Sequence, residues 1–281
     1  MKITSVPSVN ELIKRALEED AGNGDITTTS TIPESAVAFG RYIAKEDGVL
    51  CGMPVVRAVF DEIDENIELN IKVNEGERFK KGDILAEVRG NARCVLTGER
   101  VGLNLLQHLS AIATRTAEAV EKVQGYKAKI TDTRKTTPGL RYLEKLAVRV
   151  GGGTNHRYNL SDGVLIKDNH IVAAGGITNA VKAARNAVPH TLKIEVEVED
   201  FDQLNEALDA GADIIMLDNM SCEDMRKAVE IVNGRAYLEA SGNMGERELS
   251  EVAATGVDII SIGALTHSVK AMDISLKFKL I

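Results

Sequence analysis

The hydrophobic pattern of this chain changes near residue 125. Before that point, short apolar runs are broken by glycine turns. After it, strand-like apolar runs alternate with amphipathic helical segments, and the last four strand-like runs recur about every 22 residues. Such alternation is typical of parallel strands joined by helical crossovers. It predicts an α/β barrel, incomplete or complete, with an open doubly wound sheet as the alternative.

The first part of the chain mixes strand and helix patterns. Residues 36–92 alternate in the β manner between glycine turns, which predicts short strands. Residues 97–123 carry leucines at helical spacing and predict one long helix. The capping-box spacing of Ser8 and Glu11 predicts a helix start near Ser8. Residues 27–31 are expected to be extended, and Pro138 suits the first turn of a later helix.

The C-terminal tail has a pattern of its own. Ile274, Leu276, Phe278 and Leu280 alternate with polar residues, which predicts a half-buried antiparallel strand. Such a strand does not fit a parallel barrel, so we expect it to pair with the N-terminal sheet. The predicted domains are therefore an N-terminal α/β sandwich over 1–112, completed by 270–281, and an α/β barrel of the incomplete TIM-like type over 113–269.

Composition narrows the classes of function. The chain has 281 residues, of which 44% are hydrophobic, and a formal net charge of −8, which argues against a broad nucleic-acid-binding surface. Aromatic residues make up only 4%, so a base-stacking platform is not expected. Three separated cysteines suit a reducing compartment. We see neither a signal peptide nor a membrane span, and we expect a cytoplasmic protein.

Within this acidic chain, basic residues gather between Thr131 and His170. In an α/β barrel, residues at the carboxyl ends of the strands line the site, and this rule collects a cationic and an acidic group. The cationic group is Arg134, Lys135, His156, Arg157 and Lys167. The acidic group is Glu197 and Asp218. The small turns Ser241-Gly242-Asn243 and Gly263-Ala264 suit a phosphate. Together they predict a pocket for a small molecule with anionic groups at one end and ribose hydroxyls at the other.

Each of these residues also has a simpler interpretation. Lys167 could be a Schiff-base lysine of a barrel aldolase. His156 could be a hydrogen-bonded core histidine. Glu197 could lie on a solvated strand face, and Asp218 could cap the helix near Cys222. The conjunction of all of them at strand ends favours the pocket.

The motifs then resemble a known family. The segment from Asp132 to Arg141, DTRKTTPGLR, resembles the signature of quinolinate phosphoribosyltransferases. Further ordered matches run along almost the whole chain. They are Glu19-Asp20 through Gly24-Asp25-Ile26-Thr27, Glu99-Arg100 through Asn104-Leu105, Gly152 to Arg157, Leu165 to His170, Glu195-Val196-Glu197, Leu217-Asp218-Asn219, Glu239 to Gly242 and Leu265 to Ser268.

This resemblance implies an activity, a cofactor and partners. Quinolinate and phosphoribosyl pyrophosphate would give nicotinate mononucleotide, pyrophosphate and CO₂, with Mg²⁺ accompanying the pyrophosphate substrate and no organic cofactor. The family's fold is an N-terminal sandwich plus a barrel. The protein would be a homodimer, or a higher oligomer, in which Arg100 reaches the site of the other subunit. No nucleic-acid or membrane partner is implied.

The resemblance also implies residue roles. Arg134, His156, Arg157 and Lys167 would hold the carboxylates of quinolinate. Lys135 and Lys167 would face the pyrophosphate. Glu197 and Asp218 would bind ribose hydroxyls and contribute, indirectly, to the metal environment. Ser241, Gly242, Gly263 and Ala264 would hold the 5-phosphate. The predicted catalytic residues are Lys135, Lys167, Glu197 and Asp218.

Three alternatives stay open at this point. One is a paralogue with the same fold and another small substrate, such as the type associated with molybdenum transport. The second is the Schiff-base aldolase using Lys167. The third is a non-catalytic carrier or scaffold, since residues 36–92 have the spacing of the half-barrels in biotinyl and lipoyl carriers but lack a modified-lysine turn.

Overall fold

The computed structural model describes residues 3–281, and its contacts divide the chain into two compact units. The first comprises the chain up to Ala117 together with Thr137–Gly152 and Ser268–Ile281. The second comprises Glu118–Thr136 and Gly153–His267. The predicted boundaries, 1–112 with 270–281 and 113–269, stay a prediction. The compact units differ from them mainly in assigning residues 137–152 to the first unit.

The first unit is built on an antiparallel sheet in the order β12-β1-β5-β3. Its strands are β1 (Val37–Ala44), β3 (Glu68–Ile71), β5 (Ile84–Asn91) and β12 (Ile274–Leu280), and β2 (Gly48–Val49) pairs separately with β4 (Arg78–Phe79). The tail strand β12 pairs with β1, with Ala44 opposite Ile274. This confirms that the C-terminal strand returns to the N-terminal sheet.

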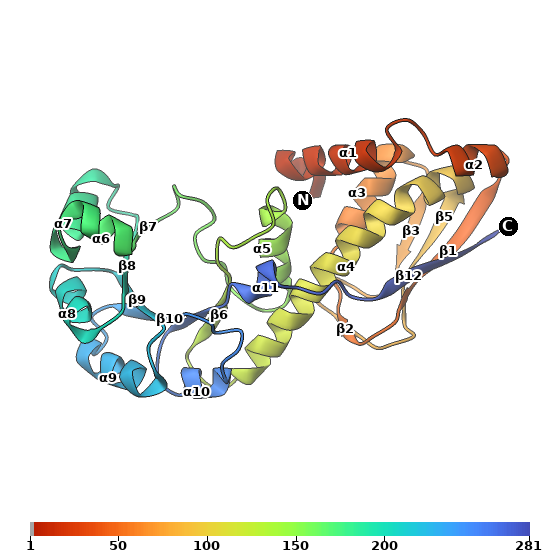
Figure 1. Cartoon of the computed structure of the whole chain (residues 1–281). Coiled ribbons are helices and arrows are strands. Elements are labelled where there is room, and N and C mark those ends of the chain that lie inside the picture. The colour runs from red at the N-terminus through yellow and green to blue at the C-terminus, as the bar shows by residue number, and fades with distance from the viewer. Residues whose placement is uncertain (1–2) are drawn as a thin grey trace. The chain divides into compact units, whose positions relative to one another are not determined.

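The helices of this unit are η1 (Ile3–Ser5), α1 (Pro7–Ala21), α2 (Ile26–Thr31), α3 (Met53–Ile63), α4 (Ala92–Lys122, whose last turns belong to the second unit) and α5 (Arg141–Val150). Of these, α3 and α4 pack against the sheet and form its core (Figure 1). Phe60 of α3 and Leu106 of α4 pack with Tyr42 of β1 and Leu276 of β12 in one buried cluster. A helical layer against a sheet is the α/β sandwich that the sequence predicts.

Three local predictions in this unit are wrong, and a fourth, the helix start near Ser8, is confirmed but without the expected capping box. Residues 53–63 form helix α3 where short strands were expected. Residues 26–31 are helical because the Asp25 carboxylate accepts a hydrogen bond from the Thr28 N–H and so caps α2. Helix α1 begins at Pro7 without a side-chain cap, so Ser8 is no capping residue. Pro138 precedes α5, which begins at Arg141.

The second unit is built on six parallel strands in the order β6-β11-β10-β9-β8-β7. These strands are β6 (Lys129–Thr131), β7 (Val164–Ile166), β8 (Ile194–Val198), β9 (Ile214–Asp218), β10 (Tyr237–Ser241) and β11 (Ile259–Ser261). In residues 3–281 no pairing joins β6 to β7, so the barrel is incomplete. The predicted fold class is confirmed.

The crossovers of the barrel are helical, and α7, α8 and α9 lie along its outer face (Figure 1). The helices are α6 (Asp168–Ala174), α7 (Ile177–Ala187), α8 (Phe201–Asp209), α9 (Cys222–Val232), α10 (Leu249–Ala253) and α11 (Ala264–His267). Parallel strands place all their carboxyl ends at one edge, which is where the predicted site residues fall. Across residues 3–281, no helix is long and apolar enough to cross a membrane.

Candidate active site at the strand ends

The segment that carries His156 and Arg157 is attached to the free edge of β6. The Thr154 N–H donates to the Ile130 carbonyl at 2.8 Å, and Thr131 forms a parallel bridge with Thr154. The fully buried Asp132 then accepts two further bonds, at 3.0 Å from the His156 N–H and at 2.5 Å from the Asn155 side-chain amide. A buried carboxylate needs such donors, and these fix where His156 and Arg157 enter the barrel.

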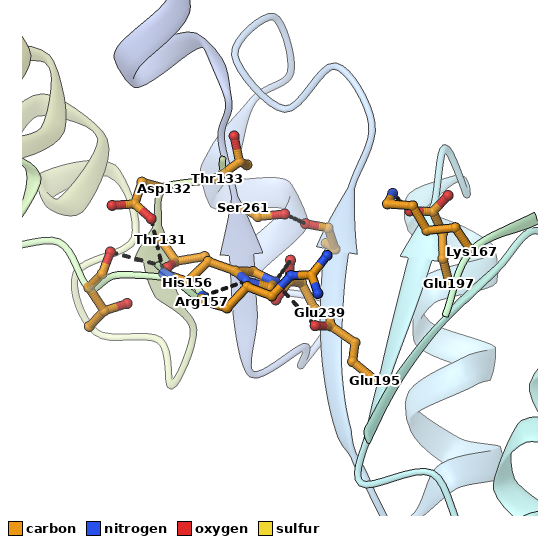
Figure 2. Close-up of polar contacts among 12 residues, drawn as sticks. Thr131, Asp132, Thr133, His156, Arg157, Lys167, Glu195, Glu197, Glu239 and Ser261 are labelled. Atoms are coloured by element: carbon orange, nitrogen blue, oxygen red, sulfur yellow. Dashed lines mark hydrogen bonds and ion pairs between the residues drawn. The ribbon is translucent and has the colours of Figure 1, made fainter. Parts of the chain in front are cut away.

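His156 contacts two buried carboxylates inside the barrel (Figure 2). Its Nε2 atom lies 3.1 Å from Glu195 Oε2 of β8 and 3.7 Å from Glu239 Oε1 of β10. Its Nδ1 atom accepts a 2.7 Å hydrogen bond from the backbone N–H of Arg157. Burial raises the pKa of Glu239 to about 7, with the charge of Glu195 acting in the same direction and His156 opposing both. The three residues could together offer a metal ion three ligand atoms.

Arg157 stands beside this cluster as a partly buried cation. Its guanidinium donates to the Gly163 carbonyl at 2.9 Å, while its Nε atom is buried and has no hydrogen-bond partner among residues 3–281. Burial lowers the pKa of Arg157, and the neighbouring positive charge of Arg134 adds to this. Two arginines close enough to repel each other favour an anion between them. Arg134 itself is exposed.

Lys167 forms an ion pair with Glu197 on the same edge of the sheet (Figure 2). The Lys167 side chain is 43% exposed and that of Glu197 is 17% exposed. Lys167 follows the last residue of β7, and its backbone N–H donates to His170 Nδ1 at 3.0 Å in the first turn of α6. Both charges therefore lie at the solvent-facing mouth of the barrel, where a ligand can reach them.

Lys135 is held against the turn that follows β11. Its backbone carbonyl accepts a 2.7 Å hydrogen bond from the Thr266 hydroxyl. A Cβ atom at Gly263 would lie 3.0 Å from Lys135 Cδ, so the absence of a side chain at Gly263 leaves room for the lysine stem. The structure thus brings Lys135 together with Gly263 and the adjoining Ala264.

The turns after β9 and β10 are interlocked. The Asn219 N–H donates to the Ser241 carbonyl at 3.1 Å, and the Asn219 amide donates to Asp218 at 2.8 Å. Gly242 has a φ of +92°, and a Cβ there would lie 2.8 Å from the Asn219 backbone nitrogen. Only glycine fits this close approach. Asp218 does not cap α9, because the Ser221 side chain does.

The fold of the second unit thus gathers every predicted site residue except one. Arg100 belongs to the first unit, where it is exposed on α4. Sequence reasoning missed the supporting roles of Asp132, Glu239 and Asn219. The sequence did contain a signal for Glu239. It lies two residues before Ser241 on strand β10, so the two side chains share a face of the strand.

Comparison with known proteins identifies the family. The family model for the C-terminal domain of quinolinate phosphoribosyl transferase matches residues 112–277, and that for the N-terminal domain matches residues 25–110. This chain belongs to the quinolinate phosphoribosyltransferase family. The matches cover both units and so include the whole strand-end site.

Relatives of the quinolinate phosphoribosyltransferase family agree in length. The chain is 46% identical to the probable nicotinate-nucleotide pyrophosphorylase (carboxylating) of Bacillus subtilis, over 95% of this chain and 92% of that one. It is 44% identical to the nicotinate-nucleotide pyrophosphorylase (carboxylating) of Mycobacterium leprae, over 96% of each. The crystal structure of NadC from Streptococcus pyogenes superposes with a TM-score of 0.92 at 43% identity, over 97% of each chain.

Proposed function

We propose that this protein transfers the phosphoribosyl group of phosphoribosyl pyrophosphate to quinolinate and releases CO₂ and pyrophosphate, giving nicotinate mononucleotide for NAD biosynthesis. It is a pentosyltransferase of the nicotinate-nucleotide diphosphorylase (carboxylating) type. Family membership over nearly the whole chain supports the activity. The single observation that carries it is the meeting of cationic and acidic side chains at one edge of one parallel sheet.

The cationic side receives quinolinate. Arg134 and Arg157 bind its two carboxylates, since guanidinium groups pair with carboxylates through two N–H donors. His156 and Lys167 complete this side of the pocket. We propose that Arg100 of a second subunit joins them, as the family resemblance of the Glu99-Arg100 motif implies; in its own chain Arg100 is exposed on α4 of the first unit. The repulsion between Arg134 and Arg157 is relieved when the dianion binds.

The acidic side receives the phosphoribosyl group. Glu197 and Asp218 bind ribose hydroxyls, and Lys135 and Lys167 bind the pyrophosphate. The turns at Ser241-Gly242 and Gly263-Ala264 hold the 5-phosphate through backbone N–H groups. The contact between Lys167 and Glu197 supports these roles, because in it the proposed leaving-group cation and the proposed sugar-binding carboxylate are neighbours.

The donor set of this side also fits Mg²⁺, because Glu197 and Asp218 offer hard oxygen ligands at the ends of neighbouring strands. Mg²⁺ bound with phosphoribosyl pyrophosphate would neutralise charge on the departing pyrophosphate. Asp218 accepts a bond from Asn219 and Glu197 one from Lys167, so both carboxylates are already engaged by the protein, and their contribution to the metal environment is proposed to be indirect. No organic cofactor is needed.

The protein contributes to this reaction by positioning the two substrates and by stabilising the charges that develop on them. Departure of pyrophosphate from the ribose builds positive charge on the sugar, which Glu197 and Asp218 stabilise, while Lys135 and Lys167 stabilise the negative charge on the leaving group. The pyridine nitrogen of quinolinate attacks the ribose carbon. The resulting quaternary nitrogen stabilises the carbanion left on the ring when the adjacent carboxylate leaves as CO₂, and a proton from solvent then takes the place of the carboxylate. No covalent intermediate with the protein is required.

The assembly that follows is a cytoplasmic homodimer, or a higher oligomer of dimers, that uses neither nucleic acid nor a membrane. Arg100→Ala and Lys167→Ala proteins should each be inactive, and a mixture allowed to exchange subunits should recover part of the activity. Recovery is expected because one site of the mixed dimer keeps both residues. Verified exchange without recovery would show that Arg100 does not act in a partner's site.

The decisive experiment is an assay for nicotinate mononucleotide from quinolinate and phosphoribosyl pyrophosphate with Mg²⁺. Product should form with one CO₂ per nucleotide, and nicotinate in place of quinolinate should give no CO₂. Borohydride with substrate serves as the control for Schiff-base chemistry. A covalent adduct at Lys167, or no nucleotide in the assay, would refute the proposed function.

A further inference from the structure

Both ring nitrogens of His156 are engaged by the protein itself. Nδ1 accepts the Arg157 N–H at 2.7 Å, so Nδ1 carries no proton. The proton of a neutral imidazole must then be on Nε2, which lies 3.1 Å from Glu195 Oε2. In this tautomer the ring donates to Glu195 and has no lone pair left for a metal or for a proton of the substrate.

The two carboxylates beneath the ring are built into the barrel wall. Glu195 is 4% exposed and Glu239 is 1% exposed, and each has one oxygen without a hydrogen-bond partner among residues 3–281. Burying carboxylates in this way is costly. Neither is needed for the roles proposed above for the residues at the mouth. The side chain that contacts both of them is His156.

The His156 ring in turn fixes the backbone of Arg157. The hydrogen bond from the Arg157 N–H to Nδ1 holds the peptide between the two residues in one orientation. The bond from the guanidinium to the Gly163 carbonyl holds the other end of the side chain. Between these two anchors, the buried Arg157 Nε atom has no hydrogen-bond partner within residues 3–281.

We propose that Glu195 and Glu239 are positioning residues that act through His156, holding its ring so that the backbone of Arg157 presents the guanidinium to a carboxylate of the substrate. This rests on the proposed function for the role of Arg157. His156 is then a positioning residue, and the carboxylate contact belongs to Arg157. The Nε atom of Arg157 is one donor that the protein leaves unsatisfied within residues 3–281.

The first test compares two substitutions of nearly equal size. Glu195→Gln keeps an oxygen that accepts from Nε2, and Glu195→Leu removes it. Calorimetric quinolinate affinity of Glu195→Leu should fall by about tenfold or more, and that of Glu195→Gln should stay within about threefold of the parent. Affinity for phosphoribosyl pyrophosphate should change little in both. Equal losses for the two variants, or for the two substrates, would overturn the proposal.

Should Glu195→Leu fail to fold, substitutions of His156 give the same information. In His156→Asn the side-chain oxygen can replace Nδ1 and accept from the Arg157 N–H. In His156→Gln the longer side chain places its amide at the position of Nε2, so it cannot accept from the Arg157 N–H. The asparagine variant should bind quinolinate more tightly than the glutamine variant. The reverse order would show that Nε2 contacts the substrate directly.

A measurement without substrate separates this proposal from the proposed function. Nitrogen chemical shifts of the five histidines, in protein labelled with ¹⁵N at histidine, report which ring nitrogen is protonated, and the His156→Asn spectrum assigns the signal. We expect His156 protonated at Nε2 alone. Protonation at Nδ1 would overturn the inference. Failure of the parent protein to bind quinolinate would instead sink the proposed function, and the ring state would still be readable.

Discussion

Two contacts made by carboxylates of the same strand, β8, differ in nearly every physical respect. Lys167 and Glu197 meet at the mouth, where the lysine side chain is 43% exposed. His156, Glu195 and Glu239 meet deeper in the barrel, where both carboxylates are buried and the His156 side chain is 13% exposed. Glu195 and Glu197 are two residues apart and share a face of the strand. The contact between Lys167 and Glu197 is therefore near enough to solvent for a ligand to replace one partner. The contact of His156 with Glu195 lies deeper along the same strand and is not accessible in this way.

This difference in burial indicates which contacts can be broken at low free-energy cost when a substrate binds. An exposed ion pair contributes little to stability, about 0–1 kcal/mol, so breaking it for a substrate costs little. A buried carboxylate that loses its partner costs about 3–5 kcal/mol, so the deeper cluster must persist through the reaction. We therefore expect the mouth to serve ligand binding and catalysis, and the deeper cluster to hold Arg157 in position.

The largest expected effect comes from breaking the mouth contact. Lys167→Ala should lower kcat/KM by about 1000-fold, because it removes a cation that stabilises the leaving pyrophosphate. The thermal midpoint should move by only a degree or two, since the ion pair is exposed. Steady-state kinetics and calorimetry measure the two quantities. Lys80→Ala, which breaks the similar exposed pair with Asp47, is the matched control and should leave kinetics unchanged. A large stability loss in Lys167→Ala would contradict the comparison.

The next effect comes from the anchor of the deeper cluster. Asp132→Ala should lower the free energy of unfolding by about 3 kcal/mol, because it removes a fully buried carboxylate that accepts hydrogen bonds from the His156 N–H and the Asn155 amide. Asp162 is the control, since its exposed carboxylate also accepts two backbone N–H groups, from Tyr158 and Asn159, in the same segment. Asp162→Ala should cost about 1 kcal/mol or less. Denaturant titration checks both, and equal losses would mean that burial does not distinguish them.

The smallest effect is a pH dependence within the deeper cluster. The folded protein holds the Glu239 proton up to about pH 7, whereas an ordinary glutamate carboxyl, with a pKa of 4.5, releases it earlier. Stability of the parent should therefore fall between about pH 4.5 and 7 relative to Glu239→Gln. Denaturant titrations at several pH values measure this difference.

The control for the pH dependence is Glu87, whose pKa is lowered by its exposed contacts with Lys72 and Arg41. A lowered pKa gives stability that is present at higher pH and is lost as pH falls through the folded value. Glu87→Gln should therefore show a dependence of the opposite sign. A flat difference for Glu239→Gln would mean that its carboxyl titrates normally in the folded protein.

The mouth was more predictable from sequence than the deeper cluster. Strand ends follow from apolar runs, so Arg134, Lys167 and Asp218 could be placed at one edge without coordinates. The cluster depends on the pairing of β8 with β9 and β9 with β10, which brings Glu195 and Glu239 together around His156 from a loop. No local sequence pattern predicts that Glu195, Glu239 and His156 come into contact. The position of Arg100 in a partner's site likewise stays a prediction.

The misplaced elements have local causes. The sequence of helix α3 favours a strand, because Val55, Val56 and Val59 are β-branched. Packing of Phe60 in the core overrides that preference. Helix α2 is a run of threonines and a serine, poor helix formers, that depends on the Asp25 cap. In both cases an interaction outside the local pattern decides the structure.

The pairing of β12 with β1 has a consequence for synthesis. Ala44 and Ile274 are partners that lie 230 residues apart in the chain, 274 − 44. On the ribosome, the barrel segment must be made in full before the sheet of the first unit can receive its edge strand. Until then β1 presents an open hydrogen-bonding edge, which is the kind of surface that associates with other chains. The unit begun earliest is thus completed last, and its nascent form is where we expect chaperone dependence.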